Sequence, residues 1–191
     1  MMKKSLLLLA ALMLGGCATH WPETALLNPQ VIPSNQQYYS GNRITMEGVD
    51  KREAAYVFSI KKKEKAPVLV NSSQPLNNLL AEKLAEGLRS QGLEVGNSGT
   101  TNLTLAISTA AVTVEEKTFT YVTKSKVSLQ VIADFQGNKL TKQFNMSSSK
   151  EEPGEPTMAD LESTLNQQLG SVLQQIMADE ALRGYLKGQP S

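Results

Sequence analysis

Cys17 has the most distinctive chemistry in this chain, because it is the only cysteine and its thiol can form a thioether bond. It follows a segment that starts with two lysines, continues as a short apolar run over residues 5–14, and closes on two glycines. A basic start, a short apolar stretch and small residues at the cleavage point are typical of a secretory signal peptide. The run is shorter than the roughly 20 apolar residues that a membrane-spanning helix needs. We therefore predict that residues 1–16 are removed by cleavage between Gly16 and Cys17.

The tetrapeptide that ends at Cys17, Leu-Gly-Gly-Cys, resembles the lipobox of bacterial lipoproteins. The resemblance implies a diacylglyceryl group on the thiol and an N-acyl group on the new amino terminus, with no other cofactor. Each buried acyl methylene contributes about 0.8 kcal/mol, so two or three chains hold a protein on a membrane permanently. The next residue is Ala18 and not Asp. By resemblance to enterobacterial sorting, this implies the periplasmic face of the outer membrane in a Gram-negative bacterium.

The rest of the chain offers little for nucleophilic or metal-dependent catalysis. The only histidine, His20, lies three residues from the predicted anchor, which excludes Ser-His and Cys-His pairs within the folded part. The acidic pairs Glu115–Glu116 and Glu151–Glu152 lack the spacing of a calcium loop and are predicted to be solvated. We therefore expect no catalytic residue, no metal site and no enzyme. An acid-only glycosidase would need two carboxylates about 5–9 Å apart across a cleft.

The charge balance excludes another class of partner. Cleavage removes two lysines, so the formal net charge changes from +1 to −1. A near-neutral chain with mixed signs gives no support for nucleic-acid binding, which needs a basic patch. Asp50 and Arg52 form the most interesting charged pair. Two interpretations stay open for it: the pair pins the loop between the first strands, or it binds a polar ligand.

Residues 17–42 are predicted to be a flexible tether, because prolines and a polar mixture of Asn, Gln and Ser interrupt any apolar period. The tether is expected to hold the folded part at a distance from the membrane. Trp21 lies near the lipidated end, and we leave open whether it sits at the headgroup level or is an ordinary linker residue. A single domain is expected over residues 43–188.

Alternating apolar and polar residues predict strands along the domain. The predicted strands cover 43–46, 54–60, 67–70, 103–107 with 112–114, 120–135 and 140–148. A hairpin is expected around Lys61–Lys65, whose charges form a solvated tip or contact anionic headgroups or polyanions. The phase of alternation reverses between Ser108 and Ala111, which predicts a bulge or bend there.

Two amphipathic helices are also predicted. Leucines recur every four residues from Leu76 to Leu88, with Ser73 as the expected N-cap and Gly92 at the C-terminal cap. A second apolar stripe starts after a capping box at Thr157 and ends near residue 176. The predicted fold class is α+β, with an antiparallel sheet of about five strands and two amphipathic helices packed on one face.

Several motifs together resemble the YajG-like family of proteobacterial envelope lipoproteins. They are Leu14-Gly-Gly-Cys17, Asp50-Lys-Arg52, Pro75-Leu-Asn-Asn-Leu-Leu80, Gly92-Leu-Glu-Val-Gly96, Asn102-Leu-Thr-Leu-Ala-Ile107 and Gly137-Asn-Lys-Leu-Thr-Lys142. The resemblance covers nearly the whole chain. It implies an envelope lipoprotein and supplies no catalytic residues.

Two functions fit these observations. The first is a non-enzymatic binding or accessory module of an envelope complex, which binds a protein partner through its sheet. The second is a carrier or sensor for an apolar or cell-wall-derived ligand held between the helices and the sheet. The apolar stripes of both helices contain no stray polar residue, which favours a dry core and the first function.

Overall fold

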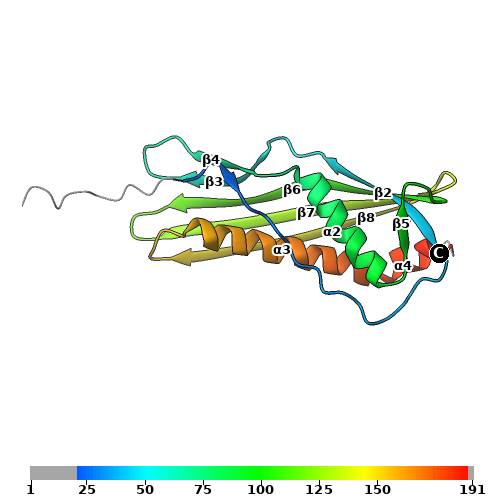
Figure 1. The fold of residues 1–191 in the computed structure, drawn as a ribbon. Helices are drawn as coiled ribbons and strands as arrows, with labels where there is room; N and C mark the ends of the chain where they lie inside the picture. The colour runs from blue at the N-terminus through cyan, green and yellow to red at the C-terminus, as the bar shows by residue number, and fades with distance from the viewer. Residues whose placement is uncertain (1–20, 189–191) are drawn as a thin grey trace, which may run out of the picture.

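The computed structural model describes residues 21–188, and helices cover one face of its sheet (Figure 1). The strands are β1 (Thr24–Ala25), β2 (Arg43–Asp50), β3 (Tyr56–Lys61), β4 (Val68–Ser72), β5 (Glu94–Gly96), β6 (Thr101–Glu116), β7 (Tyr121–Phe135) and β8 (Asn138–Glu152). The helices are α2 (Leu76–Ser90), α3 (Met158–Ala178) and α4 (Glu180–Leu186). No helix in this part of the chain is long and apolar enough to cross a membrane.

The sheet has eight strands and is mixed, which corrects the predicted antiparallel sheet of about five strands. The antiparallel meander β6–β7–β8 and the β3–β4 hairpin are confirmed. However, β2 and β3 both run parallel to β6 and lie end to end along its other edge. The strands β5 and β1 are parallel to β2 and β4, respectively. The parallel pairs β2–β5, β2–β6 and β3–β6 arise because α2 carries the chain back along the molecule, and parallel neighbours need such a crossover.

The bulge predicted in β6 is confirmed and has a clear packing role. The register with β7 shifts between Ile107 and Thr109, within one continuous strand of 16 residues. Leu103, Leu105 and Ile107 before the bulge and Ala110, Val112 and Val114 after it are all buried. Without the extra residue, the second set would turn to the opposite face, because side chains alternate along a strand.

Both predicted helices form, and their apolar stripes are buried. From Leu76 to Leu88 the leucine stripe is at most 2 % exposed. Gly92 has φ +89°, and the capping box between Thr157 and Asp160 is present. The predicted N-cap Ser73 is wrong, since α2 begins at Leu76 after Pro75 with no side-chain cap. The N–H of Ser73 instead donates to the carbonyl of Ala25, which joins β1 to β4.

The flexible tether predicted before residue 43 is wrong for the described residues 21–42. Trp21 is 8 % exposed, and Ala25, Leu27 and Tyr39 are buried more deeply. Residues 26–42, which we call the strap, run from β1 along the helices to the end of the molecule that holds the C-terminus (Figure 1). The strap therefore belongs to the folded domain and does not act as a spacer.

A row of α3 side chains binds the strap. The carboxylate of Glu162 accepts from the N–H of Leu26, and the amide oxygen of Asn166 accepts from the N–H of Asn28, both at 2.8 Å. The amide of Gln174 donates to the carbonyl of Ile32 at 3.2 Å. These three residues, with Gly170 between them, recur every four positions and so form one face of the helix. The row gives an irregular segment partners for its backbone polar groups, which water or protein must satisfy.

Gly170 allows the strap to lie close to α3. A Cβ atom at this position would lie 2.5 Å from the carbonyl oxygen of Gln30, so Gly170→Ala must displace the strap. Alanine normally stabilises a helix by about 1 kcal/mol relative to glycine, but overpacking costs about 1–3 kcal/mol. We expect Gly170→Ala to lower the free energy of unfolding by about 1 kcal/mol and to speed proteolysis within residues 26–42. Urea unfolding and limited proteolysis measure both effects.

The matched control is Gly184→Ala in α4, where an added Cβ would meet no atom within 4 Å. This change is expected to stabilise the protein slightly through helix propensity. Equal stabilisation by both substitutions would contradict a close contact between the strap and α3.

Candidate functional site

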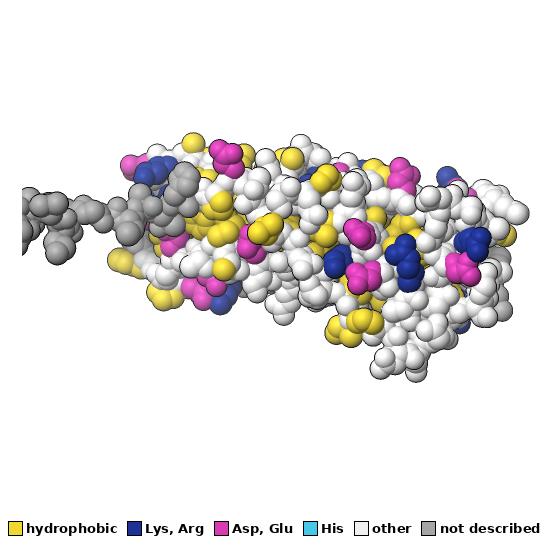
Figure 2. All heavy atoms as spheres, in the orientation of Figure 1, with side chains coloured by type: hydrophobic (Ala, Val, Ile, Leu, Met, Phe, Trp, Pro, Cys, Tyr) yellow, Lys and Arg dark blue, Asp and Glu magenta, His cyan; other side chains and the backbone are white. Residues whose placement is uncertain are grey.

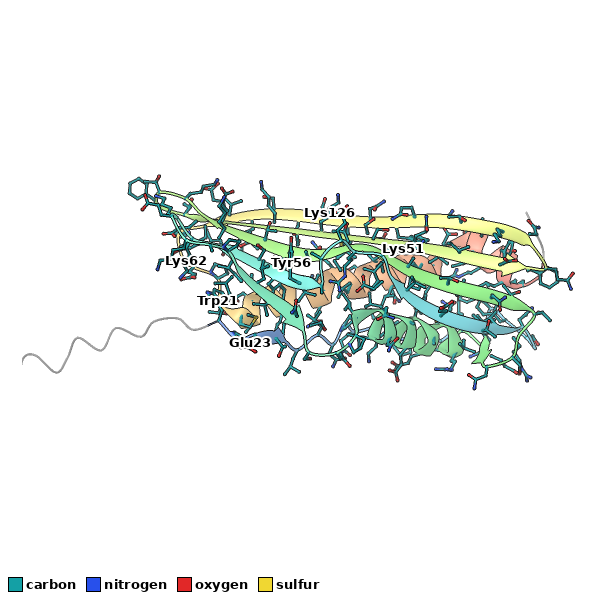
Figure 3. All side chains as sticks on the ribbon, turned by 90° about the horizontal axis from the view of Figure 1, so that it is seen from above. Trp21, Glu23, Lys51, Tyr56, Lys62 and Lys126 are labelled. Carbon is teal, nitrogen blue, oxygen red and sulfur yellow. The ribbon has the colours of Figure 1, made fainter. Side chains whose placement is uncertain are left out.

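Two of the residues that the sequence singles out, Gly16 and Cys17, lie outside the described residues. The structure therefore leaves the predicted cleavage and acylation as predictions. The other predicted pair, Asp50 and Arg52, is brought together at a fork in the sheet. There β2 ends, β3 has not yet begun, and β6 has its bulge. Lys51 and Tyr56 flank this fork near the middle of the sheet (Figure 3).

The Arg52 guanidinium binds the Asp50 carboxylate through two hydrogen bonds, from Nε at 2.9 Å and from Nη2 at 2.8 Å. Its Nη1 also donates to the carbonyl of Tyr56 at 3.3 Å. The N–H of Lys51 donates to the carbonyl of Ile107 on β6, at 2.9 Å. The Arg52 side chain is only 8 % exposed. The pair thus ties the end of β2 to the start of β3 across the gap in the sheet.

A hollow of about 400 Å³ lies beside this pair and is lined by residues 51–54, Tyr56 and residues 108–111. Arg52 uses three of its five N–H donors within the protein, which leaves little capacity for a ligand. The hydrogen bonds from Arg52 lower the pKa of Asp50 from its ordinary value. The geometry favours the loop-pinning interpretation over a ligand site.

Removing the guanidinium should destabilise the fork. Arg52→Ala leaves the Asp50 carboxylate without its partner, and hydrogen bonds to charged groups contribute about 1.5–3 kcal/mol. We expect a loss of about 2 kcal/mol in the free energy of unfolding at neutral pH, measured by urea titration. Because the pKa of Asp50 is lowered by folding, its contribution is complete above the ordinary value of about 3.9 and disappears as the pH falls below it.

The pH dependence supplies the check on this prediction. The difference in stability between wild type and Arg52→Ala should shrink as the pH falls well below 4, since Asp50 is then protonated in both proteins. The part that remains is the hydrogen bond from Arg52 to the Tyr56 carbonyl. Arg43→Ala is a suitable control, because Arg43 pairs with Glu94 with both side chains more than half exposed, where ion pairs contribute little. A constant difference between wild type and Arg52→Ala over the whole pH range would contradict the assigned role.

An acid-only glycosidase needs two carboxylates across a cleft, and several acidic residues gather at the start of α3. A hollow of about 600 Å³ there is lined partly by Glu152, Glu155 and Asp160. Glu152 and Glu155 each pair with a lysine at 2.7 Å. A general acid needs a raised pKa, whereas hydrogen bonds from Thr157 lower the pKa of Asp160. Within residues 21–188, no group of three or more potential metal ligands is gathered. Nothing in this geometry indicates a catalytic function.

A buried polar cluster between α3 and the sheet is a feature that the sequence analysis missed. Gln168 is 6 % exposed, and its amide donates to the hydroxyls of Ser125 at 2.6 Å and Ser148 at 3.0 Å. It lies within the apolar stripe of α3, so the expectation of a stripe without polar residues is wrong. The signal was present, since Ser125 and Ser148 occupy core-facing positions in the alternation of β7 and β8.

The second face of the sheet and the outer edge of β8 are uncovered within the described part of the chain. On the second face, alternate residues of β7 and β8 are polar or charged, and Lys126 points away from the helices (Figure 3). β8 pairs along its full length with β7, and no strand in the described part of the chain pairs with its other edge. This edge, Asn138–Glu152, is the candidate docking surface.

Comparisons with known proteins identify the family. The family model described as "Uncharacterized lipoprotein" matches residues 29–187. No curated protein matches the chain significantly. The crystal structure of protein XCC0632 from Xanthomonas campestris is similar, with a TM-score of 0.65, 9 % identity, and coverage of 88 % of this chain and 99 % of that chain.

The similarity to protein XCC0632 shows a shared fold. The rare lipoprotein B structure from Shewanella oneidensis has 11 % identity and covers 72 % of this chain and 95 % of that chain. Its TM-score of 0.36 is too low to show a shared fold. The family model covers most of the sequence and agrees with the motifs from Asp50 to Lys142. The chain therefore belongs to this family of uncharacterized lipoproteins, the YajG family.

Proposed function

We propose that this protein is an outer-membrane lipoprotein of the periplasmic face that acts as a non-enzymatic docking module of an envelope complex. The observation that carries the proposal is the free edge of β8. Acylation of Cys17 would hold the module on the membrane, and a protein partner would bind the edge and the adjoining polar face. Membership of a lipoprotein family supports the membrane anchor.

The β8 edge has the properties that strand addition requires. It is 15 residues long, and its register with β7 runs without interruption from Glu152 to Asn138. An unpaired edge presents backbone N–H and C=O groups to another strand, and natural proteins usually protect such edges. Here the charged residues that protect natural edges lie towards the two ends of β8, and residues 143–149 between them carry no charge. A partner strand would gain main-chain hydrogen bonds from the edge and specificity from alternate side chains.

The alternative function, a carrier for an apolar ligand, requires space between the helices and the sheet. The leucine stripe of α2 is buried, and the α3 residues from Leu161 to Ile176 that face the sheet are at most 1 % exposed apart from Gln168. The hollow at the start of α3 and the hollow beside Arg52 are open to the surface and lined mainly by polar residues, and a more apolar hollow lies between the strap and α3. This packing supports the docking module over the carrier.

Crosslinking in intact cells tests the proposal. A photoreactive residue is placed at Ser147 in β8 or at Lys126 on the polar face, with Glu82 on the exposed side of α2 as the matched control. We expect a discrete protein adduct from the first two positions and none from the third. If none of the positions gives an adduct while the protein remains in the outer membrane, the docking function is wrong and the carrier becomes the better explanation.

A further inference from the structure

The end of the molecule that carries the N-terminal residues also carries two exposed turns. These are the hairpin over residues 62–67 between β3 and β4, and the turn over residues 117–120 between β6 and β7. In Figure 1 both turns lie at the end of the sheet opposite the C-terminus. Figure 3 shows Lys62 and Trp21 together at this end. We call it the anchor-proximal end.

The chain between the predicted anchor and the domain is very short. Trp21 is 8 % exposed and belongs to the hydrophobic core, so the folded part reaches at least to this residue. A fully extended chain spans at most about 3.6 Å per residue, so four steps from Cys17 to Trp21 reach about 14 Å. The headgroup layer on each side of a bilayer is about 5–8 Å thick. An acylated Cys17 would therefore bring the anchor-proximal end to the membrane surface.

Large apolar side chains are exposed at this end. Phe119, in the turn between β6 and β7, is 86 % exposed, the highest value among the exposed large apolar residues. Val68 and Leu69, where β4 leaves the hairpin, are 40 % and 51 % exposed. Single exposed apolar residues are ordinary. Phe119 stands out because it is almost fully exposed at the tip of a turn, whereas Val68 and Leu69 are partly exposed on opposite faces at the start of β4.

Side chains of both signs lie at this end (Figure 2), and residues 61–65 themselves carry four lysines and one glutamate. Within residues 21–188, Lys61, Lys63 and Lys65 form no ion pair, and Lys62 pairs with Glu155 at 2.7 Å. Glu64 accompanies them on the hairpin. The other carboxylates near the turns have partners within the protein. Glu115 pairs with Lys117, Glu116 accepts from the N–H of Lys63, and Glu151 accepts from the Thr120 hydroxyl. Glu116 and Glu151 keep their negative charge in these hydrogen bonds. The cations left for lipid phosphates are therefore Lys61, Lys63 and Lys65, whose long stems can lie along apolar surface.

We propose that the anchor-proximal end binds the lipid headgroup layer directly, with Phe119 inserted among the headgroups and the hairpin lysines on lipid phosphates. The inference rests on the acylation of Cys17 contained in the proposed function. It assigns a membrane-contact surface to the folded domain, in addition to the anchor. The consequence is a fixed orientation, in which β6, β7 and β8 stand away from the membrane and extend the docking edge into the periplasm (Figure 1).

The test uses the acylated full-length mature protein in vesicles of phosphatidylethanolamine and phosphatidylglycerol. Since Cys17 would be blocked by acylation, Thr118→Cys provides a unique site for a fluorescent probe beside Phe119. Ser98→Cys, in the exposed turn before β6, is the matched control at the opposite end. The 16 residues of β6 separate the two positions by about 50 Å. A spin label on the lipid headgroups serves as the quencher.

We expect quenching severalfold stronger at Thr118→Cys than at Ser98→Cys, and weaker quenching at Thr118→Cys when Phe119→Ser is added. Equal quenching at both positions in vesicle-bound protein would overturn the membrane contact and leave the anchor and the docking function intact. An unchanged signal after Phe119→Ser would overturn the insertion of Phe119. Protein that fails to float with the vesicles would overturn the anchor, and with it both proposals.

Discussion

Substitution of Cys17 by serine is expected to abolish acylation completely and to leave the precursor with residues 1–16 attached. A hydroxyl cannot replace the thiol in thioether formation, and the lipobox-like sequence would then lack its acyl acceptor. The effect is large because the anchor depends on this one residue. At about 0.8 kcal/mol for each buried methylene, losing two or three acyl chains removes far more binding energy than any surface contact supplies. Incorporation of labelled palmitate and fractionation of membranes measure the change.

The folded domain should be unaffected by this substitution. The described structure starts at Trp21 and contains no cysteine, so the urea midpoint of Cys17→Ser should equal that of the wild-type domain. Ala18→Asp is the matched control, because it should keep acylation and change only the membrane to which the protein is sorted. Palmitate incorporation by Cys17→Ser would contradict the assignment. Maturation of the wild-type precursor that globomycin does not inhibit would contradict it as well.

Local periodicity was sufficient to predict the elements that depend on neighbouring residues. The leucine repeat from Leu76 to Leu88 predicted α2, and the capping box at Thr157 predicted the start of α3. The reversed alternation around Ser108 predicted the bulge in β6. In each case the signal lies within about one turn of helix or a few residues of strand, where the spacing of side chains is fixed by backbone geometry.

The pairing of distant strands could not be predicted in the same way. Nothing in the composition of β2 or β3 shows that both lie along the same edge of β6, because parallel pairing depends on where α2 returns the chain. The strap shows a second limit. Its sequence resembles a linker, and it is ordered by partners more than 100 residues away on α3, such as Glu162 and Asn166. Tertiary contacts here override local composition.

The same distinction applies to the candidate site. The proximity of Asp50 and Arg52 follows from two residues of separation, so it could be predicted, and its position at the fork could not. The free edge of β8 became visible only when the order of strands was known. The strap also changes the functional picture. With residues 21–42 bound to the domain, an anchor at Cys17 no longer implies a distant, freely tethered module.

Leu84→Ala in α2 is expected to lower the free energy of unfolding by about 2–5 kcal/mol, the range for fully buried leucines. Leu84 is 0 % exposed and lies in the middle of the α2 stripe. Its loss removes apolar contacts and leaves a cavity that a close-packed core only partly refills. Since small domains are stable by about 5–15 kcal/mol, this one change uses a large part of the total. Urea or thermal unfolding measures it.

This substitution also distinguishes the two functions, because they differ in how the space around Leu84 is filled. Glu82→Ala, two residues away on the exposed side of α2, is the control and should change stability by less than about 0.5 kcal/mol. A dry, filled core predicts the full loss, and it predicts that a small apolar molecule such as benzene restores part of the stability by entering the new cavity. A ligand carrier predicts a small loss, because its interior already contains space that can adjust. A loss below about 1 kcal/mol would therefore argue against the filled core on which the docking function depends.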